Sequence, residues 1–250
     1  MAKFKNKTVF ISGGTSGIGL AAAKEFIAQG ASVIITGRNP QTINEAVAFL
    51  GTNAHGIVSD ASRMEDILLL NQRVAEYTPT IDILFANAGY GKFAPIDAVS
   101  EEMFDELFDV LVKGTYFTIK ELLPLINPNG SVIMNTSVVT EYGSVFATVY
   151  SAAKAAVQSL IKTLAAELVV KNIRVNGVSP GYTATNIFNN TGMTTEQIIA
   201  TKDYVKTILP LKRFADAAEV AAAVVFLGSD DASYIHGTEI RVDGGYTSIR

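Results

Sequence analysis

Near the start of the chain stands the run Thr8-Val9-Phe10-Ile11-Ser12-Gly13-Gly14-Thr15-Ser16-Gly17-Ile18-Gly19, from which the architecture follows. Its first four residues form a short apolar, β-rich run, and residues 20–29 after it have a helical composition closed by Gly30. The glycines permit a tight turn and a close approach of the backbone to a pyrophosphate, for which the helix N-terminus adds unpaired N–H groups. An ordinary glycine-rich turn between strand and helix is the alternative explanation.

Similar apolar runs recur along the chain, and helical stretches separate them. They lie at residues 32–36, 55–59, 82–86, 130–136, 174–179 and 238–242. A chain of 250 residues without a linker-like stretch predicts one α/β domain spanning residues 1–250. We expect a Rossmann-like, doubly wound sheet of seven mostly parallel strands with helices on both faces. The first half would bind a cofactor, and the second half would carry catalysis and substrate binding.

The composition argues against several partners and sites. A net charge of −4 without clustered Lys or Arg argues against nucleic acid and anionic membranes. The longest apolar stretch, residues 220–227, is far shorter than the roughly 20 residues of a membrane helix. No signal-peptide pattern is present, so the expected location is cytoplasmic. Two histidines, His55 and His236, are too few for a multi-histidine metal site or a histidine-dependent triad, and no metal is predicted.

The end of the second strand favours one cofactor. It reads Gly37-Arg38-Asn39-Pro40 and lacks the acid that would accept hydrogen bonds from a ribose 2′-OH. A guanidinium can instead bind a 2′-phosphate, so Arg38, with polar contacts from Ser16 and Asn39, predicts NADP(H). The alternative is that Arg38 points into solvent while Asn39 caps a helix beginning at Pro40; that cap is expected in either case.

Tyr150 and Lys154 are the candidate catalytic pair. Their i, i+4 spacing in an Ala-rich stretch places both side chains on one face of a helix. A neighbouring ammonium would lower the pKa of the phenol towards the working range of a general acid/base. Ser137 follows the buried strand at residues 130–136, where its hydroxyl can hold a carbonyl oxygen. An amphipathic surface helix is the alternative explanation of the pair.

Together with the glycine turn and the run Asn87-Ala88-Gly89, these residues resemble the short-chain dehydrogenase/reductase family of the shorter, single-domain type, from about residue 7 to 246. Ser12 stands where Thr is usual in the family's turn. The resemblance implies interconversion of a ketone or aldehyde and an alcohol, with hydride transfer from or to the nicotinamide. Tyr150 would exchange the proton, Ser137 would orient the oxygen, and Lys154 would also hold the ribose hydroxyls.

The resemblance also implies most cofactor contacts. Asp60 and Ala61 would contact the adenine, although Asp60 also suits the cap of a helix at residues 62–77. Asn87-Ala88-Gly89 would flank the ribose or serve structure alone, and Pro180-Gly181-x-Thr183-x-Thr185 would bind the carboxamide. The full expected set is Gly13, Thr15, Ser16, Gly17, Ile18, Gly19, Arg38, Asn39, Asp60, Ala61, Asn87, Ala88, Gly89, Tyr150, Lys154, Pro180, Gly181, Thr183 and Thr185.

One residue departs from the family pattern. Leu111, in a long helical region at residues 100–126, stands where the family has an Asn that helps a water chain recharge the lysine with protons. Its side chain cannot do so, although its backbone carbonyl could if the local helix shape survives. Tyr142 and Phe146, in the loop of residues 138–149, are expected to border the substrate. Residues 186–212 are expected to form a lid.

The sequence thus predicts an NADP(H)-dependent oxidoreductase that acts on a small-molecule carbonyl or alcohol and forms a homo-oligomer, a dimer or a homotetramer. A cofactor-binding regulatory protein that has lost catalysis is the first alternative, for which Leu111 is the hint. An epimerase or dehydratase ranks lower, because that branch of the family usually has a longer chain and a tighter glycine spacing.

Overall fold

The apolar runs of the sequence pair as strands of one sheet in the computed structural model, which describes residues 2–185 and 194–249. The strands are β1 (Thr8–Ser12), β2 (Ser32–Gly37), β3 (Ala54–Val58), β4 (Ile81–Ala86), β5 (Ile126–Asn135), β6 (Arg174–Pro180) and β7 (Glu239–Val242). They lie in the order β3-β2-β1-β4-β5-β6-β7, and every neighbouring pair is parallel. The predicted seven-stranded, Rossmann-like sheet is confirmed, and it is parallel throughout rather than mostly parallel.

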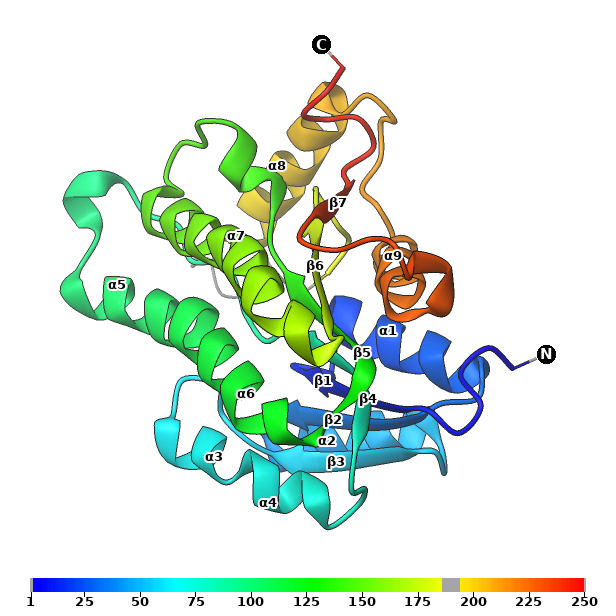
Figure 1. The fold of residues 1–250 in the computed structure, drawn as a ribbon. Helices are drawn as coiled ribbons and strands as arrows, with labels where there is room; N and C mark the ends of the chain where they lie inside the picture. The colour runs from blue at the N-terminus through cyan, green and yellow to red at the C-terminus, as the bar shows by residue number, and fades with distance from the viewer. Residues whose placement is uncertain (1, 186–193, 250) are drawn as a thin grey trace.

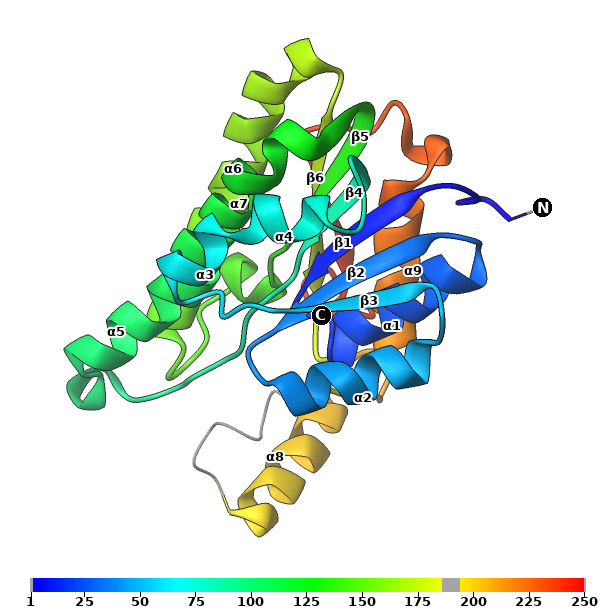
Figure 2. The same cartoon turned by 90° about the horizontal axis from the view of Figure 1, so that it is seen from below.

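Helices cover both faces of the sheet (Figures 1 and 2), because successive residues of a strand point to opposite sides. In β1, Val9 and Ile11 face one apolar core and Phe10 faces the other. The first core contains residues of α1 (Gly17–Ala28), α2 (Pro40–Leu50) and α9 (Ala217–Gly228). The second contains residues of α3 (Met64–Leu68), α4 (Leu70–Ala75), α6 (Thr115–Leu122) and α7 (Thr148–Leu168).

The strand order sets the place of a ligand site. The chain moves outwards from β1 to β3 and then crosses back to β4, which pairs with β1 on its other side. The loops after β1 and β4 therefore leave the sheet in opposite directions and open a crevice at the strands' C-terminal ends. Beyond those ends, α5 (Glu101–Phe108) packs against the start of α7 in a third apolar cluster that includes Leu107 and Tyr150.

Two predicted helices are interrupted. The helix expected at residues 62–77 is two short helices, α3 and α4, and the region expected at 100–126 contains a π-helical segment, Asp109–Gly114, between α5 and α6. Gly114 allows this segment to approach the loop after β3, because a Cβ there would lie 2.2 Å from the Ala61 carbonyl oxygen. A π-helical turn inside a helix leaves backbone carbonyls without their usual partners and often occurs at functional sites.

The region expected as a lid is described only in part. Residues 186–193 lie outside the described residues, and α8 (Thr195–Ile208) follows them. A capping box begins α8, because the Thr194 hydroxyl accepts a hydrogen bond from the Gln197 N–H, and the Gln197 side chain accepts one from the Thr194 N–H. Within the described chain, no helix combines the length and apolar character needed to cross a membrane.

The glycine turn depends on the absence of a side chain at Gly19. A Cβ there would lie 2.2 Å from the Gly13 carbonyl oxygen and 2.6 Å from the Asn87 side-chain nitrogen. We predict that Gly19→Ala lowers the free energy of unfolding by about 2 kcal/mol, although alanine favours a helix by roughly 1 kcal/mol. Urea denaturation at constant m value measures the change.

Gly143→Ala is the matched control, because no atom of the described residues lies within 4 Å of a Cβ at that position. We expect its free energy of unfolding to stay within about 1 kcal/mol of the parent. Equal stability of the two variants would contradict the close packing of the turn.

Candidate functional site

A cleft of about 600 Å³ runs along the C-terminal ends of the strands. Almost all site residues predicted from the sequence line it. They are Gly13, Thr15, Ser16, Gly17, Ile18, Arg38, Asn39, Asp60, Ala61, Asn87, Ala88, Gly89, Ser137, Tyr150, Lys154, Pro180, Gly181, Thr183 and Thr185. Gly19 is the exception, since it packs beneath the turn against Gly13. The fold therefore brings together residues that the sequence spreads over more than 170 positions.

The glycine turn opens into this cleft. Gly13 and Gly17 have φ angles of 67° and 53°, in the region that favours glycine. Ser16 precedes α1 but makes no side-chain capping hydrogen bond within the described structure. The first N–H groups of α1 are thus left for a ligand, and a helix N-terminus of this kind binds anions.

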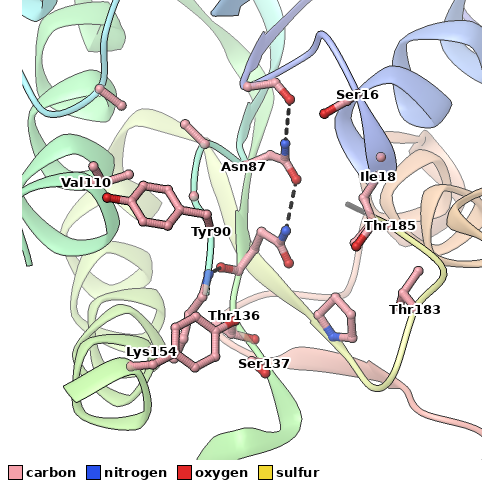
Figure 3. Close-up of a pocket in the computed structure, with 18 of the residues that line it drawn as sticks. Ser16, Ile18, Asn87, Tyr90, Val110, Thr136, Ser137, Lys154, Thr183 and Thr185 are labelled. Atoms are coloured by element: carbon pink, nitrogen blue, oxygen red, sulfur yellow. Dashed lines mark hydrogen bonds between the residues drawn. The ribbon is translucent and has the colours of Figure 1, made fainter. Parts of the chain in front are cut away.

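A chain of hydrogen bonds connects the turn to the candidate catalytic residues (Figure 3). The Asn87 side-chain nitrogen donates to the Gly13 carbonyl oxygen at 2.9 Å, and the Asn87 side-chain oxygen accepts from Asn135 at 2.9 Å. Lys154 Nζ then donates to the Asn135 carbonyl oxygen at 2.7 Å. Ser12 Oγ fixes the same loop by accepting from the Asn87 and Ala88 backbone N–H groups at 3.0 and 3.1 Å. Asn135 was not among the predicted site residues.

Ser137 and Tyr150 meet at the inner wall of the cleft. Ser137 lies just beyond β5, where its Oγ accepts a hydrogen bond from the Val139 N–H at 3.3 Å. The Ser137 hydroxyl lies near enough to the Tyr150 phenol to act on the pKa of that phenol in the lowering direction. Tyr150 lies in the first turn of α7 and is 8% exposed. Its ring packs edge to face against the Phe93 ring, and the two ring centroids are 5.5 Å apart. A substrate oxygen placed here would meet two hydroxyl groups at once.

Burial controls the proton equilibria of this site. It raises the pKa of Tyr150 to about 12, although the hydrogen bond with Ser137 acts in the lowering direction. It lowers the pKa of Lys154 to about 8. The prediction that Lys154 lowers the Tyr150 pKa is wrong for this structure. The ammonium lies 5.9 Å from the ring centroid and donates to a backbone carbonyl, while desolvation disfavours both charged forms.

Leu111 lies in the π-helical segment behind the cleft. Its side chain is 1% exposed, and a Cβ on Gly89 would lie 2.5 Å from Leu111 Cδ2. The leucine thus packs tightly against the loop that carries Asn87-Ala88-Gly89. Within the helical region expected at residues 100–126, the turn that contains Leu111 is π-helical.

At the other end of the cleft, the structure adds Tyr90 to the predicted residues. The Arg38 guanidinium lies 6.0 Å from the centre of the Tyr90 ring, and the Tyr90 hydroxyl donates to Glu106 at 2.6 Å. Lys92 forms an ion pair with the same carboxylate at 2.6 Å, and these two hydrogen bonds lower the Glu106 pKa. Tyr90 comes directly after Asn87-Ala88-Gly89, which was the only signal in the sequence.

Asn39 and Asp60 also have local structural roles. The Asn39 side chain caps α2 by accepting from the Gln41 N–H at 2.8 Å, as expected. Asp60 accepts from the N–H and the hydroxyl of Ser62 at 2.9 and 2.8 Å, which forms a turn before α3. Both residues still border the cleft.

The second half of the cleft is formed by the loop after β6. The Gly181 N–H donates to the Val242 carbonyl at 2.9 Å, and Thr185 lies over the glycine turn, 3.2 Å from a Cβ on Gly17. Tyr142 borders the cleft as expected, but Phe146 does not, because its side chain is 53% exposed. Its backbone carbonyl instead accepts a hydrogen bond from the Ala94 N–H.

The described residues fit a bound dinucleotide. The glycine turn packs closely against the loop after β4, because a Cβ on Gly13 would lie 2.8 Å from the Ala88 Cα. A side chain at Gly13 would therefore displace the backbone that lines this part of the cleft. Asn135 Oδ1 is buried and has no hydrogen-bond partner among the described residues. Arg38 provides a cation at the end of β2. Phosphates, a ribose and an amide are the groups that such a set of donors and acceptors can hold.

Fold and site thus define a dinucleotide-binding α/β protein, and comparison with known proteins gives its family. A family model described as Enoyl-(Acyl carrier protein) reductase matches residues 13–247. The chain is 36% identical over 250 residues to oxidoreductase asL5 of Sarocladium schorii, covering 99% of this chain and 98% of that protein. It is 33% identical over 248 residues to the 3-oxoacyl-(acyl-carrier-protein) reductase of Thermotoga maritima, and this match covers 97% of this chain and 98% of that protein.

A solved structure of levodione reductase superposes with a TM-score of 0.90 at 27% identity, covering 99% of this chain and all of that one. The chain therefore belongs to the short-chain dehydrogenase/reductase family. Members of this family are oxidoreductases that use nicotinamide cofactors, act on small molecules and commonly form oligomers.

The buried lysine makes a prediction about stability and pH. Lys154 is 5% exposed, and its pKa falls from 10.5 to about 8 on folding. Below pH 8 it is charged in both states and the burial penalty is present in full. Between pH 8 and 10.5 the folded state binds fewer protons than the unfolded state, so the penalty shrinks as pH rises. Between pH 7 and 10.5, the free energy of unfolding of the parent should therefore rise by up to about 3 kcal/mol relative to that of Lys154→Met.

Urea denaturation of both proteins across this pH range measures the difference. Lys162→Met is the matched control, because Lys162 is exposed on the same helix. Its difference from the parent should stay nearly constant with pH. A constant difference for Lys154→Met as well would contradict a charged, desolvated lysine at the site.

Proposed function

We propose that the protein is an NADP(H)-dependent oxidoreductase that interconverts a ketone or aldehyde and an alcohol, with Tyr150 as the general acid/base. The observation that carries this proposal is the placement of Ser137 and Tyr150 in one cleft that also holds the glycine turn. Levodione reductase and the Thermotoga maritima protein are both named as reductases, which supports the same chemistry.

In a reduction, different residues of the chain would have different roles. When bound, the dinucleotide supplies a hydride to the carbonyl carbon. Ser137 donates a hydrogen bond that orients the carbonyl oxygen, and Tyr150 transfers its proton to that oxygen, so that the product is an alcohol. A phenol with a pKa of about 12 is protonated at neutral pH and ready to donate. Lys154, whose ammonium lies 5.9 Å from the centre of the tyrosine ring, would hold the ribose hydroxyls of the cofactor.

Arg38 supports the choice of NADP(H) over NAD(H). It is exposed at the end of β2, where neither Gly37 nor Asn39 offers a carboxylate to a ribose 2′-OH. The Tyr90 ring lies beside its guanidinium and limits the directions in which it can point. A planar guanidinium held in this way can bind a phosphate with two hydrogen bonds.

We also propose that the protein forms a dimer or tetramer of identical chains. The family commonly forms oligomers, and α5 presents a stacked pair of rings, Phe104 and Phe108, whose centroids are 4.6 Å apart. Phe104 is 44% exposed, and Tyr116 on the neighbouring α6 is 39% exposed. A second copy of the chain could bury such side chains.

The role of Tyr150 is tested by removing its hydroxyl. Tyr150→Phe keeps the ring and its contact with Phe93, so we expect NADPH affinity to change less than about threefold. Turnover of carbonyl substrates should fall by about 10²- to 10⁴-fold, the usual contribution of a general acid. NADPH oxidation and NADPH fluorescence titration measure the two effects.

Tyr116→Phe, on α6 outside the cleft lining, should leave turnover unchanged. Undiminished activity of Tyr150→Phe would remove the tyrosine from the mechanism. NADPH binding by the parent without turnover of any carbonyl would favour the regulatory role instead, for which the buried Leu111 is the structural hint.

The cofactor preference is tested at Arg38. Arg38→Asp should lower the ratio of kcat/KM for NADPH over NADH by about 100-fold or more, because a carboxylate repels the 2′-phosphate and accepts from the 2′-OH. Arg38→Lys keeps the charge but not the planar fork and should give an intermediate ratio. Steady-state kinetics with both cofactors measures the ratios, and an unchanged ratio for Arg38→Asp would refute the role of Arg38.

A further inference from the structure

The cleft has a second end, away from Arg38, whose walls are apolar and aromatic. Its lining side chains come from the loops after β4, β5 and β6 and from the segment before α9. They are Phe93, Val139, Tyr142, Tyr182 and Phe214. Phe93 also contacts the ring of Tyr150, so this end begins at the candidate catalytic residue itself.

The tyrosines of this end are held by one another. Tyr246, in the C-terminal segment after β7, contacts Tyr142 and Tyr182 edge to face, with ring centroids 5.2 and 5.4 Å apart. The three hydroxyls lie near enough to act on one another's pKa, and burial raises the pKa of Tyr142 and of Tyr182. Tyr182 also meets the edge of Phe214 at 5.9 Å. Because the rings pack edge to face against one another, they offer a ligand mainly apolar surface in a fixed arrangement.

Charge is confined to other parts of the cleft. Of the described side chains that line it, only those of Arg38, Asp60 and Lys154 carry a guanidinium, carboxyl or amino group. Arg38 and Asp60 follow β2 and β3, at the opposite edge of the sheet from β6 and β7. Lys154 is 5% exposed and donates to the Asn135 carbonyl. None of the five side chains that form the aromatic end is a cation that could compensate a substrate carboxylate or phosphate.

We infer that the substrate is an uncharged carbonyl compound that carries an aromatic or alicyclic ring next to the carbonyl group. The ring would pack between Phe93 and the Tyr142–Tyr182 wall, while the carbonyl oxygen meets the hydroxyls of Ser137 and Tyr150. A charged group packed against these half-buried rings would lose part of its hydration without gaining an ionic partner, which disfavours its binding. This inference rests on the proposed carbonyl reduction and narrows its substrate class.

A pair of ketones of equal shape tests the inference on the unmodified protein. 4-Acetylbenzamide and 4-acetylbenzoate share the ring and the acetyl group and differ in the charge of one substituent. We expect kcat/KM with NADPH to be at least about 100-fold higher for the amide than for the carboxylate. Comparable values for the two ketones would overturn the inference and leave the proposed carbonyl reduction standing.

A charge-introducing variant gives an independent reading. Phe214→Arg places a cation at the wall of the aromatic end and should shift the amide-to-carboxylate ratio towards the carboxylate by at least about tenfold. Phe49→Arg is the matched control, because Phe49 is 62% exposed on α2 and outside the cleft lining. Its ratio should equal that of the parent, and equal ratios in all three proteins would contradict the placement of the substrate ring.

Binding without turnover separates the two proposals. Saturation-transfer NMR in the presence of NADP⁺ compares the product alcohols 4-(1-hydroxyethyl)benzamide and 4-(1-hydroxyethyl)benzoate. Preferential binding of the amide without turnover of either ketone would refute the proposed reduction and support the selectivity of the aromatic end. Absence of both turnover and preference would overturn both proposals.

Discussion

Two asparagines, Asn87 and Asn135, connect the glycine turn to the helix that carries Tyr150 and Lys154. Asn87 joins the glycine turn after β1 to Asn135 at the end of β5, and the Asn135 carbonyl receives the hydrogen bond of Lys154. Strand pairing alone fixes the backbone of the sheet, but the loops beyond it have few ladder hydrogen bonds. These side chains therefore extend the order of the sheet into the cleft and connect the glycine turn to Lys154.

The same burial that orders the site also controls its chemistry. Tyr150 and Lys154 are both almost inaccessible to water. Desolvation raises the pKa of Tyr150 and lowers the pKa of Lys154, which is not the pattern of an ammonium that acidifies a phenol. This arrangement suits the proposed reduction at neutral pH, because the phenol would keep the proton that the proposed mechanism requires it to donate. In the proposed reduction, the Ser137 hydroxyl, which acts on the Tyr150 pKa in the lowering direction, would compensate the charge left on the phenol.

The sequence predicted most of the sheet and the cleft, because continuous apolar runs are readable as buried strands and the glycine spacing marks the turn. It could not predict the interruption of the region at 100–126, since Gly114 is explained only by a distant backbone, that of Ala61. Tyr90 was missed for a similar reason: its partners Arg38 and Glu106 are neighbours only in space. The predicted direction of the Tyr150 pKa shift was wrong, because an i, i+4 spacing indicates that two side chains are close but not how deeply they are buried.

The central claim is that the glycine turn and the Ser137–Tyr150 pair serve one bound dinucleotide. A crystal structure of the protein with NADPH tests it most directly. The account predicts density for the phosphates at the N-terminus of α1, for the 2′-phosphate beside Arg38, and for the nicotinamide ring in the space bordered by Ser137 and Tyr150. A nicotinamide ring outside that space, or phosphates away from the glycine turn, would contradict it.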